Sequence, residues 1–268
     1  MKKNPLFWFG VVFLGLLVLA SIFVPMFKPY DYKVGPVFAP PSAQFWMGTD
    51  HKGYDIAARL AYGARVSLLI GLSVQAIALV VGLVLGVVSV FGPRWLSNVI
   101  LRLTDGMFAF PDILLAILII GIWNDRGIRP VVAALAITAW PGVVRLVRAQ
   151  VASLKDREFV VASRALGGSV THAVLKHILP HIWPMLMAVL MVELAGTILA
   201  ESALSFLGIG VQPPTPSWGM MISDARSLLN AAPMQLIWPC VVLSLTIFAL
   251  NFLGDGLRAA LDPKKGEG

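Results

Sequence analysis

The stretch VSLLIGLSVQAIALVVGLVLGVVSVFG, from Val66 to Gly92, contains no charged side chain over 27 residues. A run of about 18 or more apolar residues is long enough to cross the hydrocarbon core of a membrane as a helix. The whole chain shares this character, because 58% of its 268 residues are hydrophobic and only 13% are charged. A soluble domain carries about 25% charged residues. The sequence therefore predicts an all-α, polytopic membrane protein.

Runs of this kind predict six membrane-spanning helices. They lie near residues 6–27, 65–92, 106–123, 130–150, 182–204 and 233–256. The third run is interrupted by Asp112. The first follows Lys2 and Lys3, as in a signal peptide, but its length of about 22 residues exceeds the 7–15 of a signal core. We therefore predict a retained N-terminal anchor helix and a single transmembrane domain over residues 1–268, with core spans over 65–256.

The distribution of basic residues predicts the orientation. With a cytoplasmic N-terminus, the cytoplasmic segments hold 13 of the 21 Lys and Arg residues, as the positive-inside rule favours. Both termini and the polar insert 153–181 are then cytoplasmic, and the loops 28–64 and 206–232 are external. The net charge of +7 is explained by cytoplasmic loops, so no nucleic-acid partner is expected.

Each external loop has room for one short helix. We expect these helices near residues 52–62 and 217–229. Thr49 or Asp50 is placed to cap the first helix and Ser217 the second, because their side-chain oxygens accept hydrogen bonds from free N–H groups.

Several catalytic and cofactor motifs are missing from the sequence. There is no G-x-x-x-x-G-K-[ST] phosphate-binding loop, no C-x-x-C and no H-E-x-x-H. His177 and His181 have i, i+4 spacing, but Pro180 lies between them, and a metal site needs further ligands. We therefore predict no metal site, no cofactor in this chain and no enzymatic activity.

The polar insert 153–181 is predicted to form two short helices. The first runs near Asp156 to Leu166, and one of its faces combines Phe159, Ala162, Ser163 and Leu166. Gly167 and Gly168 end it, because glycine tolerates the left-handed turn that closes a helix. Ser169 caps the second helix, whose apolar side holds Val170, Ala173, Val174 and Ile178. The pattern alone fits either a loop on the membrane surface or an element that docks a partner protein.

The same insert resembles a known family motif. Val161-Ala162-Ser163-x3-Gly167-x9-His177-x-Leu179-Pro180 is similar to the "EAA loop" of ABC importer permeases, E-A-A-x3-G-x9-I-x-L-P. Val161, Ser163 and His177 depart from that pattern. Glu158 and the His-Ile-Leu-Pro ending are similar to the dipeptide, oligopeptide and nickel permease branch.

Other segments resemble this branch in the same order along residues 45–263. Met47-Gly48-Thr49-Asp50-x-x-Gly53-x-Asp55 is similar to L-G-T-D-x-x-G-R-D, with Tyr54 in place of Arg. The remaining matches are Tyr62 to Leu68, Phe110-Pro111, Leu204 to Gly208, Trp218-Gly219 and Leu261-Asp262-Pro263.

The resemblance implies a multi-subunit machine in a bacterial or archaeal inner membrane, surrounded by membrane lipid. It implies a homologous second permease, an external solute-binding protein, and two ATPase subunits that use ATP and Mg²⁺. The residues implied in ATPase coupling are Glu158, Phe159, Ala162, Ser163, Arg164, Gly167, Leu179 and Pro180. Those implied in an external structural motif are Gly48, Thr49, Asp50, Asp55 and Trp218.

The implied function is inward transport of peptides without chemistry on them. The first alternative is import of nickel or another metal chelate by the same kind of machine. A second alternative is an ion-coupled secondary transporter that works alone, and a membrane-embedded enzyme lacks a catalytic constellation.

Glu193 and Glu201 are carboxylates in or near the fifth predicted span. A charge at the centre of a bilayer costs about 2.5 kcal/mol or more, so such residues usually face a cavity or a partner. We expect both as candidates to line a translocation pathway. The alternative for each is a hydrogen bond to a neighbouring helix, or a place at the external interface. Gly82 and Gly86 form a G-x-x-x-G pattern that predicts close helix packing.

Overall fold

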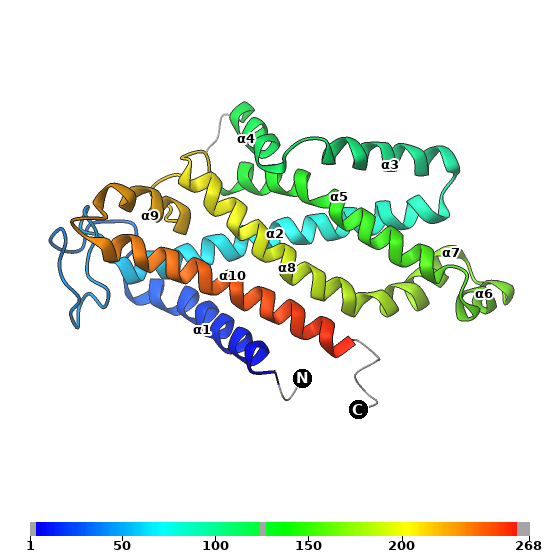
Figure 1. Ribbon diagram of the computed structural model, residues 1–268, viewed down its shortest axis with the longest axis horizontal. Coiled ribbons are helices and arrows are strands. Elements are labelled where there is room, and N and C mark those ends of the chain that lie inside the picture. The colour runs from blue at the N-terminus through cyan, green and yellow to red at the C-terminus, as the bar shows by residue number, and fades with distance from the viewer. Residues whose placement is uncertain (1–3, 124–126, 262–268) are drawn as a thin grey trace.

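The computed structural model describes residues 4–123 and 127–261, and Figure 1 shows them as a bundle of long helices. The elements are α1 (Pro5–Phe27), α2 (Ile56–Phe91), α3 (Arg94–Phe108), α4 (Asp112–Ile122), α5 (Ile128–Leu154), α6 (Glu158–Ala165), α7 (Val170–Ala173), a π turn η1 (Val174–Ile178), α8 (Leu179–Phe206), α9 (Trp218–Ala225), a 3-10 turn η2 (Arg226–Leu228) and α10 (Pro233–Leu261). Six residues on which the predicted orientation and the C-terminal motif depend lie outside the described residues. They are Lys2, Lys3, Asp262, Pro263, Lys264 and Lys265.

Five of the six predicted spans are confirmed as continuous helices. Within the described residues α1, α2, α5, α10 and the continuous helix Val170–Phe206 are long and apolar enough to cross a membrane. A sixth span is counted only if α3 and α4 are taken together. The all-α, polytopic prediction is therefore confirmed.

The third predicted span, 106–123, is wrong as a single helix. The chain bends by 93° between α3 and α4. Pro111 lies at this bend and adopts an extended conformation with ψ 124° immediately before α4. Proline has no N–H to donate, and its ring excludes the preceding residue from helical conformation. Asp112, which interrupts the apolar run, is the first residue of α4, where the helix dipole favours a carboxylate.

The start of α2 differs from the prediction. The helix begins at Ile56, so the separate short helix expected near 52–62 is in fact the first turns of α2. Its cap is Asp55, whose Oδ1 accepts a hydrogen bond from the N–H of Ala58 at 3.1 Å, rather than Thr49 or Asp50. The short helix expected near 217–229 is confirmed as α9 with η2, and Ser217 caps it by accepting from Met220 N–H at 3.3 Å.

Close packing of α2 on α5 forms the centre of the bundle. A Cβ at Gly82 would lie 2.4 Å from Cγ1 of Val143, and a Cβ at Gly86 would lie 2.6 Å from Cγ1 of Val147. The G-x-x-x-G pattern therefore has the packing role that the sequence predicts, because only glycine allows these backbones to approach.

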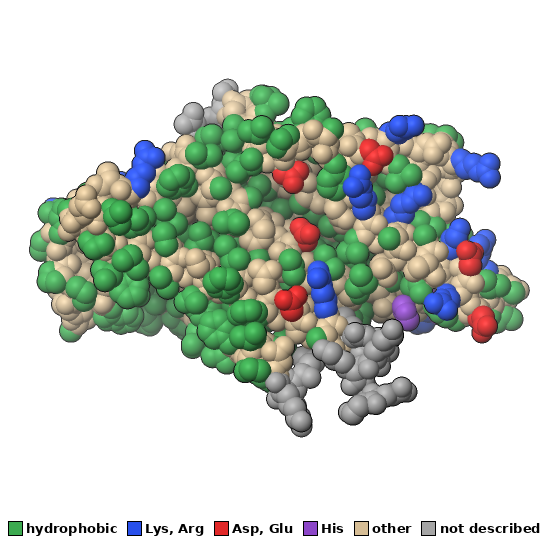
Figure 2. All heavy atoms as spheres, in the orientation of Figure 1, with side chains coloured by type: hydrophobic (Ala, Val, Ile, Leu, Met, Phe, Trp, Pro, Cys, Tyr) green, Lys and Arg blue, Asp and Glu red, His purple; other side chains and the backbone are tan. Residues whose placement is uncertain are grey.

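The bundle has two different ends. In Figure 1 the loop 28–55 and α9 lie at one end, called here the α9 end, and α6 and α7 lie at the opposite α6 end. α1 packs beside α2 and α10, and the first described turn of α1 and the last turn of α10 both point toward the α6 end. Figure 2 shows Lys and Arg side chains gathered toward the α6 end on the face drawn.

Candidate functional site

The insert at the α6 end forms a short helix closed by a left-handed glycine. Gly167 has φ +88°, and its N–H donates to the carbonyl of Arg164 at 3.0 Å. A Cβ at Gly168 would lie 2.6 Å from the carbonyl oxygen of Ser163. Ser169 then caps the next helix by accepting from His172 N–H at 3.1 Å. The two-helix prediction for 153–181 is confirmed, including its glycine corner.

α6 has one buried position and one exposed apolar face. Val160 is fully buried in a hydrophobic cluster with residues of α5, α7 and α8. Phe159 is 41% exposed and Leu166 is 89% exposed. Ala162 is exposed and Ser163 is partly buried, so the predicted face points away from the bundle. The sequence reasoning missed Val160, which is the residue that attaches α6 to the spans.

The remaining coupling candidates lie at the two ends of α6 and at the start of α8. Glu158 is the first residue of α6 and Arg164 lies in its last turn, which suits the helix dipole at both ends. Leu179 and Pro180 begin α8, directly after the π turn η1. Proline at this point lacks an N–H, which is consistent with the widened turn before it.

The histidine rings of the insert lie near one another or near Phe159, and the rings of His172 and His177 are 5.8 Å apart. The ring of Phe159 lies 6.4 Å from that of His177 and 6.1 Å from that of His181, measured between centroids. Within the described residues, no group of three or more His, Cys, Asp or Glu side chains is placed to hold a metal ion.

The predicted external motif forms the connection between α1 and α2. Gly48 has φ +78°, and a Cβ there would lie 2.4 Å from the carbonyl oxygen of Ala39. Thr49 accepts a hydrogen bond from Ala39 N–H through its hydroxyl at 2.8 Å. Asp50 accepts from the N–H groups of Lys52 and Tyr54 at 2.8 and 2.9 Å. These contacts fix the turn that leads into α2.

Asp55 attaches this loop to α2, and Trp218 attaches α9 to the same helix. Asp55 both caps α2 and pairs with Lys28 at 3.0 Å. Trp218 is fully buried, and its Nε1–H donates to the carbonyl of Leu60 at 3.0 Å. A Cβ at Gly63 would lie 3.0 Å from Cδ1 of the same indole, so α9 rests directly on α2.

Glu201 lies in packed protein. Its side chain is fully buried, and hydroxyl groups from two helices donate to it: Ser67 of α2 at 2.9 Å and Ser205 of α8 at 2.8 Å. Ser205 in turn accepts from Val211 N–H at 3.2 Å. This is the arrangement of the alternative reading, a hydrogen bond to a neighbouring helix, and a role of Glu201 in a pathway stays a prediction.

Glu193 has a different environment. It is exposed and lines a cavity of about 190 Å³ between α5 and α8. The other lining residues are apolar or glycine: Gly142, Val143, Leu146, Leu186, Val189 and Leu190. Glu193 is thus the member of the pair that has access to an open space, and its role as a pathway residue stays a prediction.

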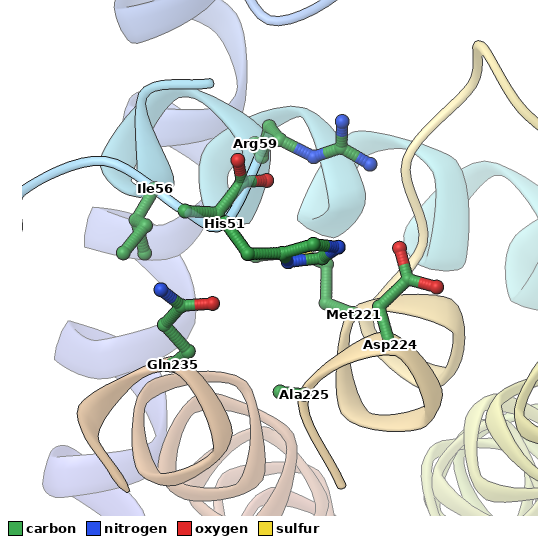
Figure 3. A pocket seen from close by; sticks show the side chains of 8 residues that line it. His51, Ile56, Arg59, Met221, Asp224, Ala225 and Gln235 are labelled. Carbon is green, nitrogen blue, oxygen red and sulfur yellow. The ribbon is translucent and has the colours of Figure 1, made fainter. Parts of the chain in front are cut away.

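A polar pocket at the α9 end contains residues that sequence reasoning missed. Figure 3 shows Arg59 of α2, His51 of the preceding loop and Asp224 of α9 around it. Arg59 is 6% exposed, and its guanidinium lies 4.7 Å from the ring centroid of Tyr54. Tyr54 replaces the Arg of the resembled motif, and here it supports a cation through its aromatic face. The signal in the sequence was Arg59, one of two arginines that precede the uncharged run of α2.

Comparison with known sequences identifies the family. Residues 78–267 match the family described as "Binding-protein-dependent transport system inner membrane component", and residues 1–52 match the "N-terminal TM domain of oligopeptide transport permease C". The chain is 36% identical to the oligopeptide transport system permease protein OppC of Bacillus subtilis, over 98% of this chain and 87% of the relative. It is 40% identical to the di/tripeptide transport system permease protein DppC of Pseudomonas aeruginosa, over 95% and 87% of the two chains.

Solved structures share the fold. A chain of the MetNI methionine ABC transporter in an inward-facing conformation matches with a TM-score of 0.64 at 18% identity, covering 76% of this chain and 96% of that chain. An amino acid ABC transporter chain matches with a TM-score of 0.56 at 16% identity, covering 77% and 94%. The chain therefore belongs to the binding-protein-dependent transport system inner membrane components, together with the peptide permease proteins of the OppC and DppC type.

Proposed function

We propose that this chain moves peptides inward across the bacterial inner membrane as one permease of a complex with a second permease, two ATPase subunits and an external binding protein. The observation that carries the proposal is the exposed face of α6, where Phe159 and Leu166 are 41% and 89% exposed beside a helix end fixed by Gly167. An apolar face on a short, closed helix suits insertion into a groove of a partner protein. On this reading ATP and Mg²⁺ are used in the partner subunits, and α6 lies in the cytoplasm with both termini.

The packing of α6 explains how force would reach the spans. Val160 belongs to the same buried cluster as Val151 and Leu154 of α5 and Ile178 and Ile182 of η1 and α8. A push on α6 therefore displaces α5 and α8 together, since close-packed interiors transmit displacement rather than absorb it. Closure of the ATPase subunits would tilt these two helices as rigid bodies and change access to the space between them.

Glu193 gives the proposed pathway a chemical preference. Its carboxylate is the acidic group in an otherwise apolar cavity between the two helices that α6 moves. A carboxylate there attracts an ammonium group, which every peptide with a free N-terminus carries. The relatives named for oligopeptides, dipeptides and glutathione favour peptides over a nickel chelate as the solute of this chain.

The test is uptake by proteoliposomes that contain the full complex. We expect accumulation of a labelled dipeptide or oligopeptide that requires ATP on the side of the ATPase subunits and persists when an ionophore removes ion gradients. Uptake that continues without ATP and stops with the ionophore would identify an ion-coupled transporter. ATP-dependent accumulation of radioactive nickel, with none of the peptides, would identify the metal-chelate alternative.

A pair of variants tests the role of α6 separately. Leu166→Asp places a charge on the exposed face, and we expect it to reduce retention of the ATPase subunits without changing the fold. Leu175→Asp is a matched control, because Leu175 is also exposed, at 60%, but lies in η1 and not on the face formed by α6 and its C-cap residue Leu166. Equal loss of ATPase from both variants would show that the contact is not specific to the α6 face.

A further inference from the structure

A cavity with a polar side and an apolar side lies at the α9 end, far from α6. It is separate from the Glu193 cavity and from the polar pocket at Arg59. It has a volume of about 290 Å³ and is lined by Ile22, Pro25 and Met26 of α1, by Val66 and Leu69 of α2, and by Ile128, Tyr30, Tyr62 and Arg65. Its polar groups are thus one guanidinium and two phenols, and the rest of its wall is apolar. Neither the exposed α6 face nor the Glu193 cavity takes part in it.

The position of this cavity coincides with the membrane boundary. Arg65 is the last charged residue before the uncharged stretch Val66 to Gly92. Tyr30 and Tyr62 lie beside it, and tyrosines gather where the acyl region of a membrane meets the headgroups. This pattern is the one expected of an arginine at headgroup depth, with the apolar part of the cavity toward the hydrocarbon region.

The polar side of the cavity is arranged to receive an anion. Arg65 is exposed, and it takes no part in the ion pairs found among residues 4–123 and 127–261. Its guanidinium lies 5.9 Å from the ring centroid of Tyr62, which stacks on Tyr30 at 3.6 Å. Hydrogen bonding with Tyr62, and then burial, raises the pKa of Tyr30 to about 12.

The apolar side continues onto the lipid-facing surface. Met26 is 70% exposed and Leu69 is 52% exposed, so chains leaving the cavity run along apolar side chains. A free phosphate ion makes no favourable contact with such an apolar wall. No acidic group is among the described lining residues, and Asp31, which follows Tyr30 in the chain, does not line the cavity. We propose that this cavity binds one anionic phospholipid, with its phosphate on the Arg65 guanidinium and an acyl chain over Leu69 and the end of α1.

The test is native mass spectrometry of the delipidated complex titrated with dioleoylphosphatidylglycerol. Hydrogen bonds to charged groups contribute enough that Arg65→Gln is expected to weaken the tightest phosphatidylglycerol binding by about tenfold or more. Leu69→Trp, which fills the apolar wall, should weaken it as well. Arg226→Gln is the matched control, because Arg226 is also exposed and lies 5.9 Å from an aromatic ring, that of Phe206, without lining this cavity. Unchanged binding by Arg65→Gln, or an equal loss in Arg226→Gln, overturns the proposal.

Two further measurements distinguish a bound phospholipid from other occupants of the cavity. An excess of inorganic phosphate should leave the bound phosphatidylglycerol in place, and its displacement would indicate a free-phosphate site instead. A photo-crosslinking amino acid at position 69 of the otherwise unchanged complex should label a lipid. Labelling of the second permease would show that a protein covers the cavity, and this measurement does not depend on the folding of any Arg65 variant.

Discussion

Replacement of Gly167 by valine tests whether the left-handed end of α6 is needed for coupling. Gly167 has φ +88°, and a Cβ there would meet nothing within 4 Å. The cost of a side chain is therefore conformational rather than steric, about 1–2 kcal/mol for an ordinary residue and more for a β-branched one. Since 1.4 kcal/mol is a factor of ten, the observed turn becomes about 5–30 times less populated relative to its alternatives.

The assay is the number of peptides accumulated per ATP hydrolysed in the reconstituted complex, with ATPase retention measured in parallel. Asparagine tolerates left-handed conformation, so coupling should fall in the order Gly, Asn, Ala, Val at position 167. Gly168→Asn is the contrasting variant, because its Cβ would lie 2.6 Å from the carbonyl of Ser163, and asparagine cannot relieve that clash. If Gly167→Val leaves coupling unchanged, or if Asn is as harmful as Val, the conformational reasoning is refuted.

Three further predictions concern packing and orientation. Glu201→Leu removes the acceptor of two buried hydroxyls and should lower stability by about 1–3 kcal/mol, whereas Glu201→Gln keeps an acceptor and should cost less; thermal unfolding of both purified variants checks this. Gly82→Ala places a Cβ 2.4 Å from Val143 and should cost about 1–3 kcal/mol, whereas Gly106→Ala, with open space around it, should be neutral in the same assay. Reporter fusions after Lys155 should report the cytoplasm and fusions after Gln44 the outside, and a cytoplasmic signal at Gln44 would contradict the orientation.

Most of the spans were predictable because they depend on local composition. Predominantly apolar runs located α1, α5, α8 and α10 to within a few residues. The third span failed because Pro111 breaks the helix through its backbone, which the hydropathy of the run does not report. The early start of α2 was missed because its first turns carry Arg59, whose burial depends on the loop and α9 rather than on the run itself.

The candidate site was predictable in outline and not in its contacts. Gly167 and Gly168 marked the end of α6 through backbone conformation, which is a local property. The burial of Glu201 could not be predicted from the sequence, because its partner Ser67 lies 134 residues away in the chain. The same holds for Val160, whose position next to the exposed face gave no sign of which side of α6 meets the bundle.

The hydrogen bonds of Glu201 fix α8 to α2 near one end, so α8 can pivot around this point. Glu201 ties α8 to α2 five residues before α8 ends at Phe206, and Thr197 adds a second tie by accepting from Gln75 at 2.7 Å. From Glu201 back to Leu179 the helix is about 33 Å long, so a tilt of about 10° around this point moves its far end by roughly 6 Å. The same tilt moves Phe206 by only about 1 Å. Large displacements of α8 at the α6 end are therefore compatible with an almost stationary α9 end.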